Sequence, residues 1–244
     1  MISDVHGNLE ALNAVLADIS RRHAESGSGR KPKILFLGDA AGYGPDPNAC
    51  IDMIQKRTVQ GVAGNHDWAV LGLTEITYFN PNAKAAIRWT DENLTPGSRS
   101  ILEKLPLVKR MQKDNIFLVH SSPYEPEEWH YLLNFSDAQV NFEHFSERIC
   151  LIGHSHLPFV MERKPAGEIT ASKGGAKLDA SCRYIINAGS VGQPRDGDPR
   201  ACYLLLNDEQ AEFVRVPYDI EITQQKMSEA GLPPPLIERL SRGL

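Results

Sequence analysis

Five short motifs of Asp, Asn and His residues follow one another along the first two thirds of the chain. They are Asp4-Val5-His6, Gly38-Asp39, Gly64-Asn65-His66-Asp67, the single His120, and Gly153-His154-Ser155-His156. Carboxylate and amide oxygens and imidazole nitrogens are ligands for divalent ions such as Mn²⁺, Fe²⁺, Co²⁺, Ni²⁺ or Zn²⁺. The sequence therefore predicts one metal site assembled from distant segments.

Each motif alone is a weak signal. Asp-x-His is frequent by chance, Gly-Asp is commonly only a turn, and a lone histidine beside an apolar run is more often a hydrogen-bonded core residue. The pair His154 and His156 carries more weight, because two buried imidazoles are costly without partners. All five motifs in one order favour metal binding over packing.

The number of potential ligands suggests two ions. One ion needs fewer than the seven candidates, which are Asp4, His6, Asp39, Asn65, His120, His154 and His156. Two ions about 3.5–4 Å apart lower the pKa of a bridging water and stabilise the entering and leaving oxygens of a phosphoryl displacement. The two oxygens of Asp39 are able to bridge such a pair.

His66 remains free for catalysis. It could donate a proton to a leaving alkoxide or bind a phosphoryl oxygen, and Asn65 beside it is also expected to contact the substrate. Asp67 is expected to support catalysis by accepting a hydrogen bond from the His66 ring.

Apolar runs precede most of the motifs. Residues 34–37, 59–63, 116–119 and 149–152 predict buried strands, and residues 8–21 and 46–57 predict helices that begin at Asn8 and Asp46-Pro47. Strands and helices that alternate in this way predict βαβ units around a parallel core. The carboxyl ends of such strands form a crevice, where the motifs are expected to converge.

The rest of the chain has a different pattern of predicted strands and helices. Residues 108–111 and 116–119 predict a hairpin, and further strands are predicted at 159–163, 184–188, 202–206 and 211–216. Helices are predicted at 82–93, ended by Thr95-Pro96-Gly97, at 219–228, closed by Gly231, and after Pro233-Pro234-Pro235. This pattern predicts a mostly antiparallel second sheet, with helices outside the two packed sheets.

The order of the motifs resembles that of the calcineurin-like metallophosphoesterase superfamily. Its pattern is Asp-x-His, Gly-Asp, Gly-Asn-His-Asp/Glu, a lone His and Gly-His-x-His. The segment from Asn187 to Arg195, NAGSVGQPR, resembles a signature of the small bacterial and archaeal phosphodiesterase branch, which is related to symmetrical diadenosine tetraphosphatases. The resemblance implies an α/β (α+β) fold, a four-layer α/β/β/α sandwich of two mixed β-sheets flanked by helices.

The resemblance also implies how the ligands divide. Asp4, His6 and His156 would hold the first ion, Asn65, His120 and His154 would hold the second, and Asp39 would bridge them.

Three segments near the motifs keep two interpretations each. Arg195 and Asp196 either bind substrate phosphate or form a surface salt bridge. The loop at 42–47, which contains Tyr43, is either part of the rim of the site or a plain turn. The residues Trp129, His130 and Tyr131 could form a wall for a nucleobase or aryl group, although helix packing is the favoured interpretation.

Bulk composition sets the remaining expectations. A length of 244 residues with 41% hydrophobic residues fits one domain over 1–244. A net charge of −5 argues against a general nucleic-acid or anionic-membrane surface. Four cysteines without Cys-x-x-Cys spacing are expected to be reduced thiols in a cytoplasmic protein. Only three residues precede Asp4, so the first strand is either very short or incomplete.

These observations favour a metal-dependent enzyme that hydrolyses a small or nucleotide-like phosphoester. The alternatives are a serine/threonine protein phosphatase, for which no long insert or basic rim is evident, and a binding scaffold without catalysis. Scaffolds of this family lose ligands, whereas all seven positions here keep competent residue types. The sequence selects neither the metal, nor diester over monoester, nor the oligomeric state.

Overall fold

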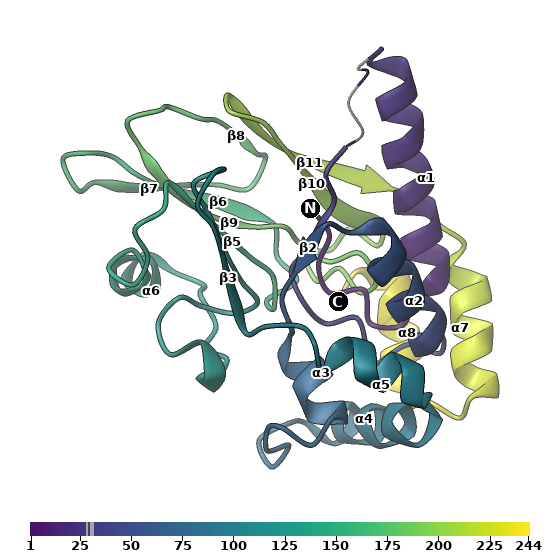
Figure 1. The fold of residues 1–244 in the computed structure, drawn as a ribbon. Coiled ribbons are helices and arrows are strands. Elements are labelled where there is room, and N and C mark those ends of the chain that lie inside the picture. The colour runs from purple at the N-terminus through teal and green to yellow at the C-terminus, as the bar shows by residue number, and fades with distance from the viewer. Residues whose placement is uncertain (28, 30–31) are drawn as a thin grey trace.

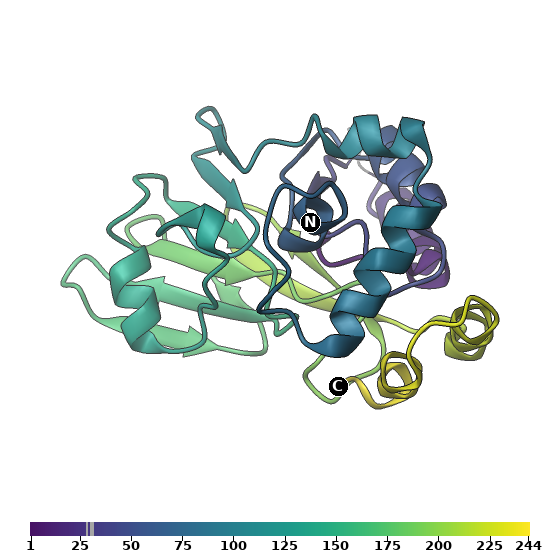
Figure 2. The same ribbon diagram turned by 90° about the horizontal axis from the view of Figure 1, so that it is seen from below.

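The protein is described by a computed structural model that covers residues 1–27, 29 and 32–244. Figure 1 shows two groups of strands side by side, with α1 (Leu9–Glu25) and α2 (Pro47–Arg57) outside one group and α6 (Phe135–Asn141) outside the other. Figure 2 shows the same separation from below, with green strands and the teal α6 on the left and the purple, blue and yellow helices on the right. The predicted four-layer α/β/β/α arrangement is confirmed.

The first layer of strands is held together by the first residues of the chain. The short strands β1 (Leu35–Phe36) and β2 (Gln60–Gly61) pair in parallel, while β10 (Ala201–Leu206), β11 (Gln210–Val216) and β8 (Ala176–Lys177) are antiparallel. The Ile2 N–H donates to the Leu35 carbonyl at 2.9 Å, and the Leu204 N–H donates to the Met1 carbonyl at 3.0 Å. Within this layer, the three residues before Asp4 therefore act as a strand that joins β1 to β10.

The second layer is a six-stranded mixed sheet in the order β3-β4-β5-β9-β6-β7. Its strands are β3 (Val108–Met111), β4 (Ile116–Val119), β5 (Ile149–Ile152), β6 (Phe159–Arg163), β7 (Ile169–Ser172) and β9 (Arg183–Asn187). β4, β5 and β9 run in parallel at the centre, while the outer pairs are antiparallel. The predicted hairpin is confirmed, and β7 and β8 were not foreseen because both are short and have few large apolar residues.

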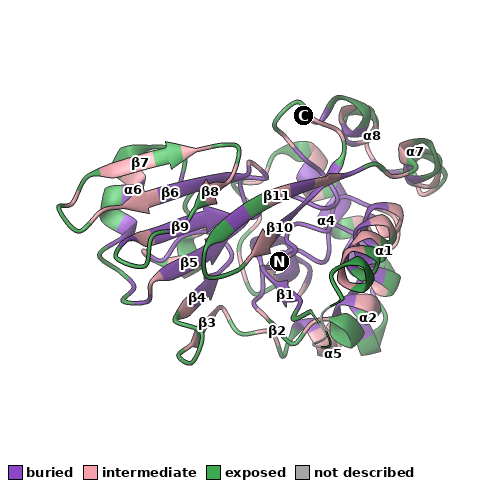
Figure 3. Ribbon diagram, turned by 90° about the horizontal axis from the view of Figure 1, so that it is seen from above, coloured by how far each residue is buried: buried purple, intermediate pink, exposed green. Residues whose placement is uncertain are grey.

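Buried apolar residues fill each gap between layers. Leu12 and Val15 of α1 pack with Phe36 and Tyr203 under the helices, Leu151 and Tyr184 lie between the two sheets, and Phe142 lies between the second sheet and α6. Figure 3 shows that β5 and β9 are buried, whereas β7 at the edge is not. The central parallel strands are thus shielded on both faces.

The remaining helices are α3 (Asn65–Val70), α4 (Pro81–Asn93), α5 (Pro96–Leu102), α7 (Ile220–Glu229) and α8 (Pro234–Glu238), with 3-10 turns at Pro126–Glu128 and Arg239–Arg242. Two predictions for the helices need correction. α1 continues to Glu25, beyond residue 21, because residues 22–25 keep its backbone bonding. Thr95-Pro96-Gly97 does end α4, but Thr95 also accepts from the Ser98 N–H and so begins α5.

The part of the chain that the structure describes contains no helix both long and apolar enough to cross a membrane. The four cysteines, all in that part, are buried and form no disulfide.

Truncating the core beneath the second sheet should destabilise the whole fold. Leu151 is fully buried in β5, so Leu151→Ala should lower the free energy of unfolding by about 2–5 kcal/mol in urea titrations. Leu133→Ala is the matched control, because that leucine is 55% exposed and should change stability by less than about 0.5 kcal/mol. Equal losses in the two variants would contradict this assignment of the core.

Candidate metal centre

The two sheets bring all seven predicted ligands together. Asp4 and His6 follow the pairing of Ile2, Asp39 follows β1, Asn65 begins α3, His120 follows β4, and His154 and His156 follow β5. All seven side chains are at most 7% exposed. Most ligands therefore follow the carboxyl ends of strands, as the sequence analysis expected.

One group of ligands lies around His6 and His156. The two Nε2 atoms of these histidines are 3.2 Å apart, and the Nε2 of His156 is 3.3 Å from an Asp4 oxygen. Asp4, His6 and His156 are close enough to bind one ion. This is the composition that the family resemblance implied for the first ion.

A second group lies around Asn65. The side-chain oxygen of Asn65 is 3.2 Å from His120 Nε2 and 3.0 Å from His154 Nδ1. One oxygen of Asp39 lies 3.3 Å from His120 Nε2 and 3.5 Å from His6 Nε2. Asp39 therefore faces both groups at once, which is the position that a bridging carboxylate needs.

The ring nitrogens of three histidines show why a cation fits here. Nδ1 of His6 lies 2.9 Å from the Ala41 carbonyl, Nδ1 of His120 lies 2.6 Å from the Leu37 carbonyl, and Nδ1 of His156 lies 2.6 Å from the Gln193 carbonyl. A carbonyl only accepts, so each Nδ1 carries a proton, and the neutral rings of His6 and His156 direct their Nε2 lone pairs inward. Lone pairs that face one another at 3.2 Å repel unless a positive charge lies between them.

The pKa values of the buried histidines also favour a cation at this point. Burial lowers the pKa of His6 and His156 well below the ordinary value and that of His154 to about 3, which keeps these imidazoles neutral. Burial alone would also lower the pKa of His120, but Asp39 and Asp4 raise it to about 9. The carboxylates therefore attract positive charge to this point, and an ion would compete with the proton of His120.

The backbone at the ligands is unusual. Asp4, His6, Asp39, His154 and His156 all have positive φ, between 48° and 65°. A non-glycine residue in this region costs on the order of 1 kcal/mol or more, and such residues concentrate at functional sites. Five of the seven ligands thus occupy conformations that the surrounding structure must impose.

Asp67 supplies part of that constraint. Its carboxylate accepts from the backbone N–H groups of Asp39 at 2.9 Å, Ala41 at 3.1 Å and Gly64 at 3.0 Å. The prediction that Asp67 accepts from the His66 ring is wrong, because the His66 Nδ1 is buried without a hydrogen-bond partner in the described part of the chain. Asp67 therefore positions the loop that carries Asp39.

Gly38 is required by close packing. Its φ is +96°, and a Cβ atom there would lie 2.6 Å from His120 Nδ1. Only glycine tolerates both the conformation and the contact.

His66 lies beside the ligand cluster within a group of rings. Its ring centroid is 4.8 Å from that of His6, 4.4 Å from that of Tyr43 and 5.3 Å from that of Phe79. The loop that contains Tyr43 is therefore part of the site and not a plain turn.

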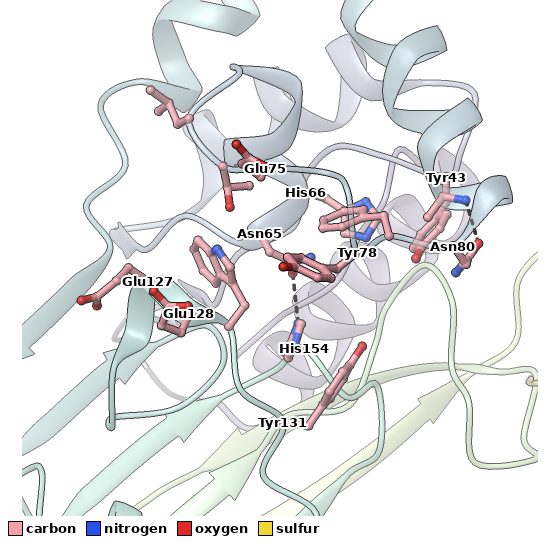
Figure 4. A pocket seen from close by; sticks show the side chains of 15 residues that line it. Tyr43, Asn65, His66, Glu75, Tyr78, Asn80, Glu127, Glu128, Tyr131 and His154 are labelled. Carbon is pink, nitrogen blue, oxygen red and sulfur yellow. Dashed lines mark hydrogen bonds between the residues drawn. The ribbon is translucent and has the colours of Figure 1, made fainter.

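A cavity of about 710 Å³ opens from the centre (Figure 4). Asn65, His66 and His154 form its floor, and Trp129 and Tyr131 form a wall, with the Tyr131 ring stacked on His154 at 4.2 Å. The favoured prediction of helix packing for residues 129–131 is wrong, since these residues follow a short 3-10 turn and lie outside any helix. Trp129 and Tyr131 instead form a wall of the site, which was the alternative interpretation.

Arg195 and Asp196 have separate roles. Asp196 pairs with Arg215 at the surface, as the salt-bridge interpretation expected. The Arg195 guanidinium instead lies over the Tyr43 ring, 5.7 Å from its centroid, which places it next to the centre.

Known proteins share this sequence and fold. Residues 1–210 match the model of the calcineurin-like phosphoesterase superfamily domain. The chain is 39% identical to the uncharacterized protein MJ0912 of Methanocaldococcus jannaschii over 247 aligned positions, which cover 100% of this chain and 97% of that protein.

Solved structures of other proteins are similar to this fold. A metallophosphoesterase from Sphaerobacter thermophilus is 40% identical with a TM-score of 0.82, and the match covers 100% of this chain and 97% of that one. A protein provisionally assigned as a diadenosine tetraphosphatase shares the fold at a TM-score of 0.52 and 16% identity, over 88% of this chain and 92% of that one. The chain belongs to the calcineurin-like phosphoesterase superfamily.

If Asp39 bridges two ions, removing its charge should weaken both metal positions. Replacing a residue that hydrogen-bonds a metal ligand commonly lowers metal affinity about 10–100-fold. Asp39→Asn changes a predicted ligand itself, so it should lower metal affinity at least about as much. The measurement is metal content by mass spectrometry after dialysis against Mn²⁺, with His130→Ala as the control because that histidine is exposed and pairs with Glu125. An Asp39→Asn protein that retains two tightly bound ions would refute the bridging role.

Proposed function

We propose that the protein uses two divalent ions, held by the seven ligands, to hydrolyse a small or nucleotide-like phosphoester. Membership of the superfamily supports metal-dependent phosphoester hydrolysis in general. The observation that carries the two-ion proposal is Asp39, one oxygen of which faces ligands of both groups. The donor set suits Mn²⁺, Fe²⁺, Co²⁺, Ni²⁺ or Zn²⁺.

The chain positions the phosphoester and controls proton transfer. When bound, the ions supply positive charge for phosphoryl oxygens and lower the pKa of a water molecule. Burial lowers the pKa of His66 to about 4, so its ring is neutral near pH 7 and can donate a hydrogen bond to a phosphoryl oxygen. An anionic phosphoester beside the ring would raise that pKa and allow His66 to protonate the leaving oxygen.

The cavity supports a small substrate with an aromatic substituent. Trp129, Tyr131 and Tyr78, which is 97% exposed, offer ring faces on which a nucleobase or aryl group can stack. The rim carries Glu75 and Glu127, and no lysine or arginine is among the described residues that line the cavity. This end of the site therefore disfavours a highly anionic group and suits a neutral one.

We further propose that the protein acts in the cytoplasm as a single domain. Its four buried, unpaired cysteines suit a reducing compartment.

A substrate panel tests the proposal. The metal-loaded protein should hydrolyse aryl diesters, aryl monoesters, cyclic nucleotides or dinucleoside polyphosphates with at least one of Mn²⁺, Ni²⁺, Co²⁺, Zn²⁺ and Mg²⁺. If no member of the panel is hydrolysed with any ion, the proposal that the protein is an enzyme is refuted and the binding scaffold remains.

His66 should affect rate and not metal content. His66→Ala should lower kcat about 100- to 10,000-fold, the usual contribution of a general acid, while bound metal stays unchanged. The measurement combines steady-state kinetics with metal analysis of the same preparation, and His144→Ala serves as the control because its ring packs on Tyr124, which is not among the residues that line the cavity. Metal loss in His66→Ala, or an unchanged kcat, would contradict this role.

A further inference from the structure

Two arginines from separate segments meet at the Tyr43 ring. Arg195 follows β9, and Arg239 begins the last 3-10 turn. Their guanidinium carbons lie 5.7 Å and 4.6 Å from the centroid of Tyr43. The ring of Tyr43 in turn lies 4.6 Å from that of His6 and 4.4 Å from that of His66.

The arginine pair lacks an anionic partner. Both guanidinium groups donate to the same Gln193 side-chain oxygen, Arg195 at 3.0 Å. Neither forms an ion pair with a carboxylate of the described residues, and each has a buried Nε without an acceptor. Arginines nearby are paired: Arg215 binds Asp196, and Arg200 binds Asp198.

Such an arrangement is unfavourable without a ligand. Two like charges share one neutral acceptor, and burial together with Arg195 lowers the pKa of Arg239 to about 10. Removing charged groups from water without a counter-charge is costly, whereas the arginine fork matches the oxygens of a phosphate group. The pair is therefore arranged to receive an anion.

We propose that Arg195 and Arg239 form a second anion subsite, which binds a phosphate group of the substrate other than the one that is cleaved. Gln193 is the positioning residue that holds the two guanidinium groups together. The subsite rests on the proposed function, and it implies a substrate with a phosphate on the Tyr43 side and a neutral substituent towards Trp129. The superfamily domain model covers residues 1–210 and does not include Arg239.

Calorimetry on the full, Mn²⁺-loaded chain tests the subsite with two non-hydrolysable probes. Methylphosphonate carries one phosphonate group, and methylenediphosphonate carries two. Arg239→Gln should weaken binding of the diphosphonate at least about tenfold and change that of methylphosphonate less than about twofold. Arg239→Lys, which keeps the charge and loses the fork, should fall between Arg239→Gln and the wild type.

Arg242→Gln is the matched control, because Arg242 is an exposed residue of the same 3-10 turn. It should bind both probes like the wild type, and all variants should keep the wild-type melting temperature. The subsite is overturned if Arg239→Gln binds the diphosphonate normally, if both probes weaken equally, or if Arg242→Gln behaves identically. Binding is measured without turnover, so a failed substrate panel would refute the proposed function and leave this test intact.

Discussion

Burying seven polar ligands at one point is the constraint on which the rest of the structure depends. The neutral rings of His6 and His156 direct their Nε2 lone pairs towards each other and towards the carboxylates of Asp4 and Asp39, and no described group donates a hydrogen bond to either Nε2. Backbone carbonyls fix the rings from behind, and left-handed turns aim them inward. Both sheets contribute, so the site forms only when the layers pack together.

The chemistry of the site could be predicted from sequence because each ligand lies in a short motif at a strand end. Gly38-Asp39 and Gly153-His154 follow apolar runs whose pattern predicts buried strands, and the packing of the two layers brings the ends of β1 and β5 together. The hairpin of β3 and β4 was predictable for the same reason, since its signal is local.

Features that depend on contacts between distant segments could not be predicted. Nothing in the residues around Asp67 shows that its carboxylate accepts from the Asp39 backbone, because that bond spans 28 positions. Arg239 lies in an ordinary polar turn and approaches Tyr43 only in the folded chain. Helix packing was favoured for Trp129, because nothing in the neighbouring residues shows that it follows a 3-10 turn and lines the cavity.

The most direct measurement is a crystal structure of the Mn²⁺-loaded protein with anomalous diffraction data at the manganese edge. The account predicts two anomalous peaks about 3.5–4 Å apart on opposite sides of Asp39, one beside Asp4, His6 and His156 and the other beside Asn65, His120 and His154. A single peak, or peaks away from these residues, would contradict it.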